Sequence, residues 1–135
     1  MVNLLAMSTK PRVRILHLED NHCDRELLQI ALADAGLDHQ MIPALNKAQF
    51  TNALSKGEFD IILSDSSLPA FDGQDALRMA RAARPSIPFL FVTGCCPPER
   101  AVRLIEAGAA AALCKSNLAS LAEAIMAALK PKQSN

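Results

Sequence analysis

From residue 12 onward, short apolar runs alternate with longer stretches in which apolar residues recur every three or four positions. Continuous short runs are typical of strands buried on both faces, whereas the longer spacing is typical of amphipathic helices. The chain therefore predicts a strict alternation of strands and helices. The predicted strands are residues 13–18, 40–45, 61–64, 87–92 and 109–114, and the predicted helices are 21–36, 46–57, 73–83, 97–108 and 117–130.

Several predicted helices begin with residues suited to that position. Asn21 and Asn46 can accept hydrogen bonds from the free N–H groups of a first helical turn, and Asn117 can do the same for the last helix. Pro97 and Pro98 open the fourth helix, where a missing N–H costs little. These caps support the boundaries drawn from the apolar pattern.

Two predicted strands are weak by composition. Pro43 interrupts the second run, which favours an edge position because proline cannot donate a ladder hydrogen bond. Residues 109–114 are rich in alanine, a poor strand former, and only their place in the alternation predicts a strand. Strands that alternate with helices form a parallel sheet covered on both faces, so the expected fold class is α/β, a three-layer α/β/α sandwich.

Length and charge narrow the possibilities. A chain of 135 residues accommodates one domain, which we expect at 12–130 between tails at 1–11 and 131–135, with no second domain. Lysine plus arginine and aspartate plus glutamate number 14 each, so neither nucleic acid nor a membrane surface is favoured as a partner. The chain lacks a signal-peptide pattern and an apolar run of roughly 20 residues. We therefore expect a cytoplasmic protein, with its four cysteines reduced.

The stretch from Asp60 to Gly73 carries the most informative residue. Its apolar run, Ile61–Leu63, predicts a buried strand that delivers Asp65 to the strand's end, and turn-forming residues follow. Open α/β sheets place their sites at the carboxyl ends of the strands. We therefore predict that Asp65 is a nucleophile, to which the rest of the chain supplies supporting groups.

Polar groups also follow three other predicted strands, and in a parallel sheet these ends share one edge. The groups are Glu19 with Asp20, Thr93, and Lys115. Neighbouring carboxylates repel one another, and Mg²⁺ would remove that repulsion. Asp65 could then attack phosphorus, with Lys115 and the Thr93 hydroxyl stabilising charge on the transferred phosphoryl group. Each residue alone is ordinary at a strand end, so the prediction depends on the complete set.

In this order the residues resemble the receiver domains of two-component response regulators. The resemblance covers residues 12–130 and is carried by four segments: Ile15–Asn21 with its acidic pair, Asp65–Gly73, Phe89–Gly94 and Cys114–Lys115. It implies a flavodoxin-like fold whose five-stranded parallel sheet has the order 2-1-3-4-5.

The resemblance also implies a role for each residue at the strand ends. Asp65 would accept a phosphoryl group from a phosphohistidine of a sensor histidine kinase or a histidine phosphotransfer protein. Thr93 and Lys115 would bind that group, and Thr93 would move inward to signal its presence. The Mg²⁺ ion would be held by Glu19, Asp20, Asp65 and the backbone carbonyl of Ser67.

Three positions depart from the family pattern. Ala112 stands three residues before Lys115, where the family usually has Tyr or Phe, so an aromatic side chain cannot report phosphorylation. Ser116 replaces the usual proline after that lysine, which leaves the geometry of this peptide bond open. His17 lies in the first strand, and we expect it to be neutral, partly buried and hydrogen bonded.

These patterns predict a signalling domain rather than an enzyme. Its partners would be the kinase or phosphotransfer protein and an unidentified downstream protein or a second copy of the chain. One alternative is a docking or dimerisation module that works without phosphorylation, which the missing aromatic residue favours. Another is a phosphatase or phosphotransferase, but such enzymes often carry a second aspartate where Ser67 stands here.

Overall fold

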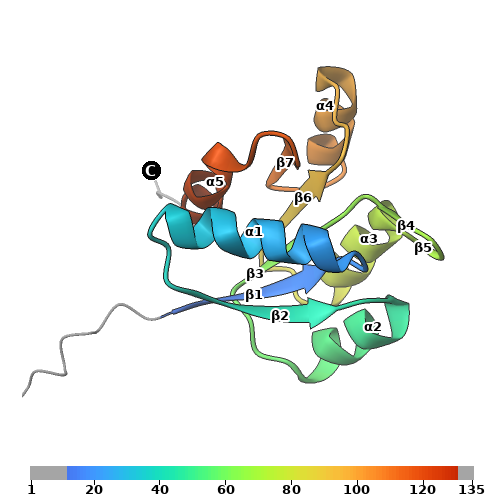
Figure 1. The fold of residues 1–135 in the computed structure, drawn as a ribbon. Helices are drawn as coiled ribbons and strands as arrows, with labels where there is room; N and C mark the ends of the chain where they lie inside the picture. Colours follow the sequence, from blue (N-terminus) through green and yellow to red (C-terminus); the bar gives the residue numbers. More distant parts are fainter. Residues whose placement is uncertain (1–11, 131–135) are drawn as a thin grey trace, which may run out of the picture.

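The computed structural model describes residues 12–130, so both expected tails lie outside the described residues. Its main sheet has five parallel strands in the order β2-β1-β3-β6-β7 (Figure 1). This order confirms the expected 2-1-3-4-5 arrangement, since β6 and β7 are the fourth and fifth strands of this sheet along the chain. The strands are β1 (Val13–Leu18), β2 (His39–Ala44), β3 (Ile61–Ser64), β6 (Phe89–Thr93) and β7 (Ala111–Cys114).

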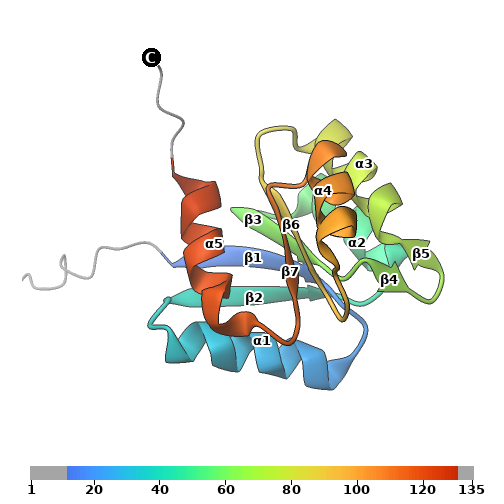
Figure 2. The same ribbon diagram turned by 90° about the horizontal axis from the view of Figure 1, so that it is seen from above.

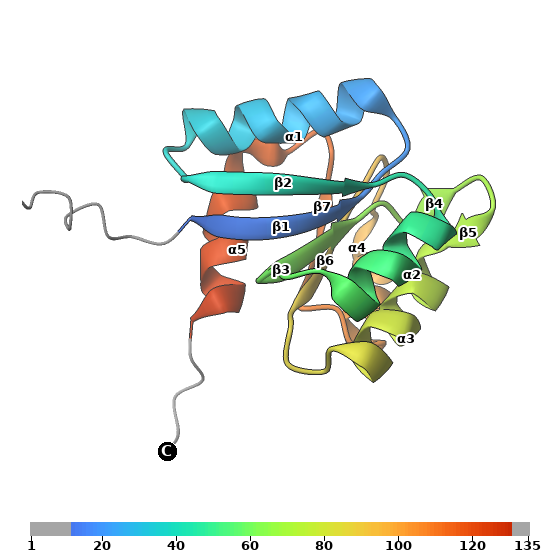
Figure 3. The same ribbon diagram turned by 90° about the horizontal axis from the view of Figure 1, so that it is seen from below.

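Helices cover both faces of this sheet, which confirms the three-layer α/β/α architecture. Helices α1 and α5 pack on one face, and α2, α3 and α4 pack on the other (Figures 2 and 3). None of the helices between residues 12 and 130 has the length and apolarity needed to cross a membrane. The helices are α1 (His22–Asp34), α2 (Lys47–Lys56), α3 (Gly73–Ala83), α4 (Pro98–Glu106) and α5 (Leu121–Leu129).

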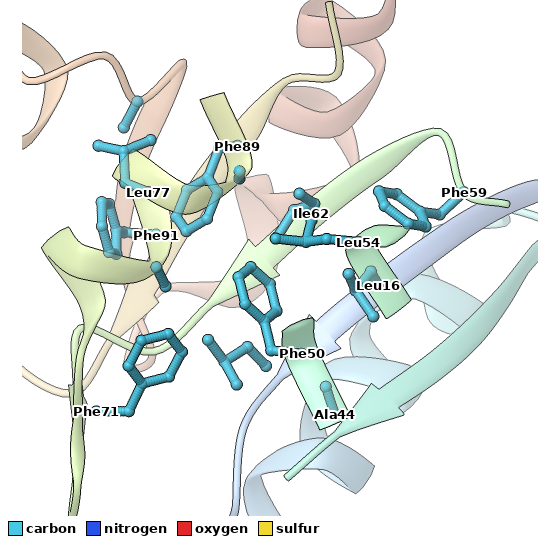
Figure 4. Packing of buried hydrophobic residues seen from close by; sticks show 14 of the residues in the cluster. Leu16, Ala44, Phe50, Leu54, Phe59, Ile62, Phe71, Leu77, Phe89 and Phe91 are labelled. Carbon is cyan, nitrogen blue, oxygen red and sulfur yellow. The ribbon is translucent and has the colours of Figure 1, made fainter. Parts of the chain in front are cut away.

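The two faces of the sheet bury different side chains. Within β1, Ile15 points toward α1 and α5 and Leu16 points toward the opposite face, because successive side chains of a strand alternate. Burial on both sides explains why the strands appear in the sequence as unbroken apolar runs. The face beneath α2, α3 and α4 holds every phenylalanine of the chain (Figure 4), namely Phe50, Phe59, Phe71, Phe89 and Phe91.

Both weakly marked strands are present, and both lie at edges of the sheet. Strand β2 contains Pro43, and the alanine-rich β7 pairs with β6 on the other side. Two local features differ from the sequence expectation. The stretch after Asp65 contains a short antiparallel hairpin, β4 (Ser67–Leu68) with β5 (Phe71–Asp72). A 3₁₀ turn at Leu118–Ser120 precedes α5, so Asn117 does not cap that helix.

Candidate functional site

Backbone hydrogen bonds continue one residue beyond the ends of β1, β3 and β7. They fix the positions of the predicted site residues that follow these strands. The Asp65 N–H donates to the Leu18 carbonyl of β1 at 3.1 Å, and the Lys115 N–H donates to the Thr93 carbonyl of β6 at 2.7 Å. The Glu19 N–H donates in the same way to the Ala44 carbonyl of β2, at 3.1 Å. All three residues therefore lie at the carboxyl edge of the sheet, where the sequence placed them.

Lys115 lies at the centre of an ion-pair network. Its Nζ atom is 2.6 Å from Asp24 Oδ2, 2.8 Å from Glu19 Oε1 and 3.5 Å from Asp65 Oδ2. The sequence brought Glu19, Asp65 and Lys115 together correctly but missed Asp24, an acid in the first turn of α1. We call these four residues the carboxylate–lysine cluster.

Burial and charge act against each other inside this cluster. Burial raises the pKa of the Glu19 carboxyl, and the Lys115 ammonium offsets only part of that rise. Burial also lowers the pKa of Lys115, but the carboxylates of Asp24, Glu19 and Asp65 outweigh it and leave the pKa raised. Lys115 is thus held in its charged form, ready to face an anionic group at Asp65.

Thr93, the remaining predicted site residue, belongs to a different set of contacts. It is buried at the end of β6, and its Oγ1 atom lies 2.7 Å from Ser66 Oγ. Arg100 of α4 donates from Nη2 to the same Ser66 oxygen, also at 2.7 Å. Neither partner was predicted from the sequence. We call Arg100, Ser66 and Thr93 the hydroxyl chain.

Gly73, the first residue of α3, lies against the backbone that follows Asp65. Its N–H donates to the Ser66 carbonyl at 3.2 Å. A Cβ atom at this position would lie 2.7 Å from Ser66 Cα and 2.9 Å from the Phe91 ring, closer than side chains tolerate. Only glycine therefore allows α3 to begin so near the site. The hairpin β4–β5 is the segment of chain between Ser66 and Gly73.

The residues expected to hold Mg²⁺ fit its chemistry through their oxygen donors. The contact between Glu19 Oε1 and Lys115 Nζ is an ion pair without hydrogen-bond geometry, so this buried oxygen has no hydrogen bond. Asp20 is exposed, and the Ser67 N–H donates to Asp65 Oδ1 at 3.4 Å. Within residues 12–130, no three acidic, histidine or cysteine residues form a ready-made metal site. Mg²⁺ binding therefore stays a prediction.

His17 lies in β1, on the same face of the sheet as Glu19. It is 2% exposed, so it is more deeply buried than expected, and its Nδ1 atom lacks the hydrogen-bond partner that was expected for this side chain. Burial, reinforced by the charges of Lys115 and Arg25, lowers its pKa to about 4. His17 is accordingly neutral at pH 7. The Lys115–Ser116 peptide bond, which the sequence left open, is trans.

Comparisons with known proteins agree with this fold. The model of one family, described as the response regulator receiver domain, matches residues 15–126. The chain is 31% identical over 110 residues to the sensor histidine kinase RcsC of Escherichia coli, covering 82% of this chain and 11% of that protein. It is 30% identical over 120 residues to the response regulator protein PilR of Pseudomonas aeruginosa, covering 88% of this chain and 26% of that protein.

A solved structure shows the same likeness in three dimensions. The CheY-like response regulator receiver domain protein of Methanospirillum hungatei matches with a TM-score of 0.75 at 27% identity, covering 88% of this chain and 94% of that one. The chain spans a small part, 11% and 26%, of the two curated relatives named above. The likeness is therefore to one domain of each of those larger proteins.

Proposed function

Because the chain belongs to the response regulator receiver domain family, we propose that it is a phosphoacceptor signalling domain. Asp65 would accept a phosphoryl group from a phosphohistidine of a sensor histidine kinase or a histidine phosphotransfer protein. The observation that best supports this proposal is the position of Lys115 Nζ, 3.5 Å from Asp65 Oδ2 at the carboxyl edge of the sheet. A cation in that place can neutralise the charge of an incoming phosphoryl group.

In the proposed reaction, a carboxylate oxygen of Asp65 attacks phosphorus. The new O–P bond forms as the P–N bond to the donor imidazole breaks, and the imidazole leaves with that electron pair. Lys115 then faces the phosphoryl oxygens, and the Thr93 hydroxyl donates a hydrogen bond to one of them. Mg²⁺, held by Glu19, Asp20, Asp65 and the Ser67 carbonyl, would supply further neutralising charge.

We propose that the domain acts in the cytoplasm and changes a protein-interaction surface rather than turning over a free substrate. Its downstream partner would be another protein or a second copy of the chain. The acid that supports phosphatase chemistry two residues after a nucleophile is absent here, since Ser67 occupies that position.

Incubation with Mg²⁺ and a small phosphodonor such as acetyl phosphate tests this proposal. Intact-protein mass spectrometry should show one added phosphate on the wild type and none on Asp65→Asn. Asp34→Asn, a matched change at an exposed aspartate at the end of α1, should be phosphorylated like the wild type. A folded wild type that gains no phosphate would overturn the proposal and favour the docking module that works without phosphorylation.

A further inference from the structure

Three of the four cysteines lie in two segments that the sheet brings together beside the candidate site. Cys95 and Cys96 belong to the loop between β6 and α4, and Cys114 ends β7. Thr93 pairs with Cys114 in the register of these strands, so the loop begins next to the Cys114 side chain. The Cys114 Sγ atom lies 3.3 Å from the Gly94 carbonyl oxygen. All these cysteines are free thiols, and the proposed phosphoryl transfer uses none of them.

Ser116 surrounds the Cys114 sulfur with hydrogen-bond donors. Its hydroxyl oxygen lies 3.1 Å from Cys114 Sγ, and its backbone N–H donates to the same sulfur. The backbone N–H of Cys96 is a further donor. These hydrogen bonds outweigh the effect of burial and lower the pKa of the Cys114 thiol. Proline, which receiver domains usually carry where Ser116 stands, has neither the hydroxyl nor the N–H.

Cys96 is placed to react with this sulfur. Its backbone N–H already contacts Cys114 Sγ, and its side chain packs against the same core cluster as Ala112 of β7. Cys114 lies two residues after Ala112 and therefore on the same face of the sheet. Cys114 is also partly exposed, so a small oxidant can reach it. The two thiols thus share one side of the sheet and a direct contact.

We propose that Cys96 and Cys114 are a redox pair that forms a reversible disulfide in the presence of hydrogen peroxide. The Cys114 thiolate attacks one peroxide oxygen, so that an S–O bond forms as the O–O bond breaks, and the departing hydroxide takes up a proton to become water. The Cys96 thiolate then attacks the Cys114 sulfur. The S–S bond forms as the S–O bond breaks, and a second hydroxide takes up a proton and leaves as water.

In this sequence the two thiols lose two electrons and two protons, and one peroxide is reduced to two waters. A dithiol reductant restores both thiols by exchange through a mixed disulfide. The thiols are therefore reduced in the resting domain, and the disulfide is transient, as redox-sensing disulfides of cytoplasmic proteins usually are.

The disulfide lies next to the proposed phosphoryl site. Cys114 opens a turn whose second residue is Lys115, and the Asn117 N–H closes this turn by donating to the Cys114 carbonyl at 2.9 Å. To bond with Cys96, the Cys114 sulfur must leave its present hydrogen bonds, which disturbs the turn that positions Lys115. Oxidation therefore slows phosphorylation of the domain. This consequence rests on the proposed function, whereas formation of the disulfide does not.

The first arm of the test treats the unphosphorylated protein with hydrogen peroxide and then labels the remaining thiols with iodoacetamide. Mass spectrometry without reductant should show that two of the four thiols escape labelling and that the peptide with Cys96 is joined to the peptide with Cys114. Cys96→Ser and Cys114→Ser should each abolish this cross-link. Cys95→Ser and Cys23→Ser, at exposed cysteines, are the matched controls and should form it like the wild type.

The second arm tests the source of the reactivity. In Ser116→Ala, labelling of Cys114 by iodoacetamide at pH 7 should slow by about two- to fivefold, and its pH profile should move upward, because the thiolate loses a donor. Ser55→Ala, at an exposed serine of α2, is the matched control and should be labelled like the wild type. An unchanged pH profile in Ser116→Ala would overturn the role given to Ser116.

The third arm compares phosphorylation by acetyl phosphate with Mg²⁺ before and after oxidation. The oxidised wild type should react about two- to tenfold more slowly than the reduced one, because Lys115 is displaced from Asp65, and dithiothreitol should restore the rate. Cys114→Ser treated with peroxide should keep the rate that it has when untreated.

The outcomes separate the two proposals. A wild type whose four thiols are all labelled after peroxide, or a cross-link that persists in Cys96→Ser, would overturn the redox pair. A disulfide that forms without changing the rate of phosphorylation would overturn only its effect on the site. A reduced protein that takes up no phosphate but still forms the disulfide would overturn the proposed function and leave the redox pair standing.

Discussion

Two sets of side chains flank Asp65, and they differ in chemistry. On the side of β1 and α1, the carboxylate–lysine cluster joins Lys115 to acids that include the almost fully buried Glu19. On the side of β6 and α4, the hydroxyl chain joins Thr93 to Arg100 through Ser66. The first set holds charge that would be costly to leave unpaired, whereas hydroxyl groups exchange partners at small cost.

This difference predicts how each set responds to a substitution. Several carboxylates hold Lys115 in place, so disturbing the cluster should affect stability strongly and in a pH-dependent way. The hydroxyl chain contains no carboxylate, so the effect of disturbing it on stability should depend less on pH.

The largest effect should follow removal of the cation. Lys115→Ala leaves the buried Glu19 carboxylate beside Asp65 without a counter-charge, and we expect it to lower the free energy of unfolding at pH 7 by about 3 kcal/mol. The loss should be smaller at pH 5 than at pH 7, because burial raises the pKa of Glu19 and removal of the Lys115 charge raises it further, so this carboxyl takes up a proton more readily as the pH falls. Urea denaturation at both pH values measures this.

Lys56→Ala, at an exposed lysine of α2, is the control and should change the free energy of unfolding by less than about 0.5 kcal/mol. An equal loss for Lys115→Ala at pH 5 and pH 7 would contradict the assignment of that loss to unpaired carboxylates.

A second prediction concerns His17, the neutral histidine of β1 that lies on the same face of the sheet as Glu19. The unfolded chain protonates His17 below about pH 6.5, whereas burial keeps the folded form neutral down to about pH 4. The wild type should therefore lose stability as pH falls through this window, and His17→Leu should avoid that loss, which approaches about 3 kcal/mol at its lower end. Leucine also removes the unpaired Nδ1 atom, so the variant should be no less stable than the wild type at pH 7.

The measurement compares unfolding free energies of wild type and His17→Leu from pH 7 to pH 4.5. His22→Ala, at an exposed histidine of α1, is the control for loss of an imidazole outside the core. A difference between His17→Leu and the wild type that stays constant across this range would show that His17 titrates normally in the folded protein.

The smallest effect should come from Asp24, the acid that the sequence did not single out. Asp24→Asn retains an oxygen that can accept from Lys115 but removes a charge from a 2.6 Å contact at a partly exposed site. We expect a loss of about 1 kcal/mol in thermal or urea unfolding. The change should also speed phosphorylation by acetyl phosphate, since Lys115 then has one competitor fewer; a slower reaction would mean that Asp24 aids the chemistry.

The fold and the charged part of the site were open to prediction because each depends on a simple geometric rule. Apolar runs separated by helices specify a covered parallel sheet, and the residues that end its strands must share one edge. That rule alone predicts the proximity of Glu19, Asp65 and Lys115.

The partners of these residues depend on side-chain directions that no linear pattern encodes. Asp24 reaches Lys115 only because the first turn of α1 faces the cluster, and Ser66 and Arg100 meet from segments 34 residues apart. The hairpin β4–β5 has strands of two residues each, too short for an alternating pattern. His17 was expected to have a hydrogen-bond partner because buried polar groups usually do.

The bond between Gly73 and Ser66 has a further consequence. Because the two residues are joined at 3.2 Å, residues 67–72 leave the sheet and return to almost the same point. Phe71 of this excursion is buried in the core and Asp72 caps α3, so these residues are constrained. The exposed tip at residues 69–70 can change in composition without displacing the segments at the base of the hairpin.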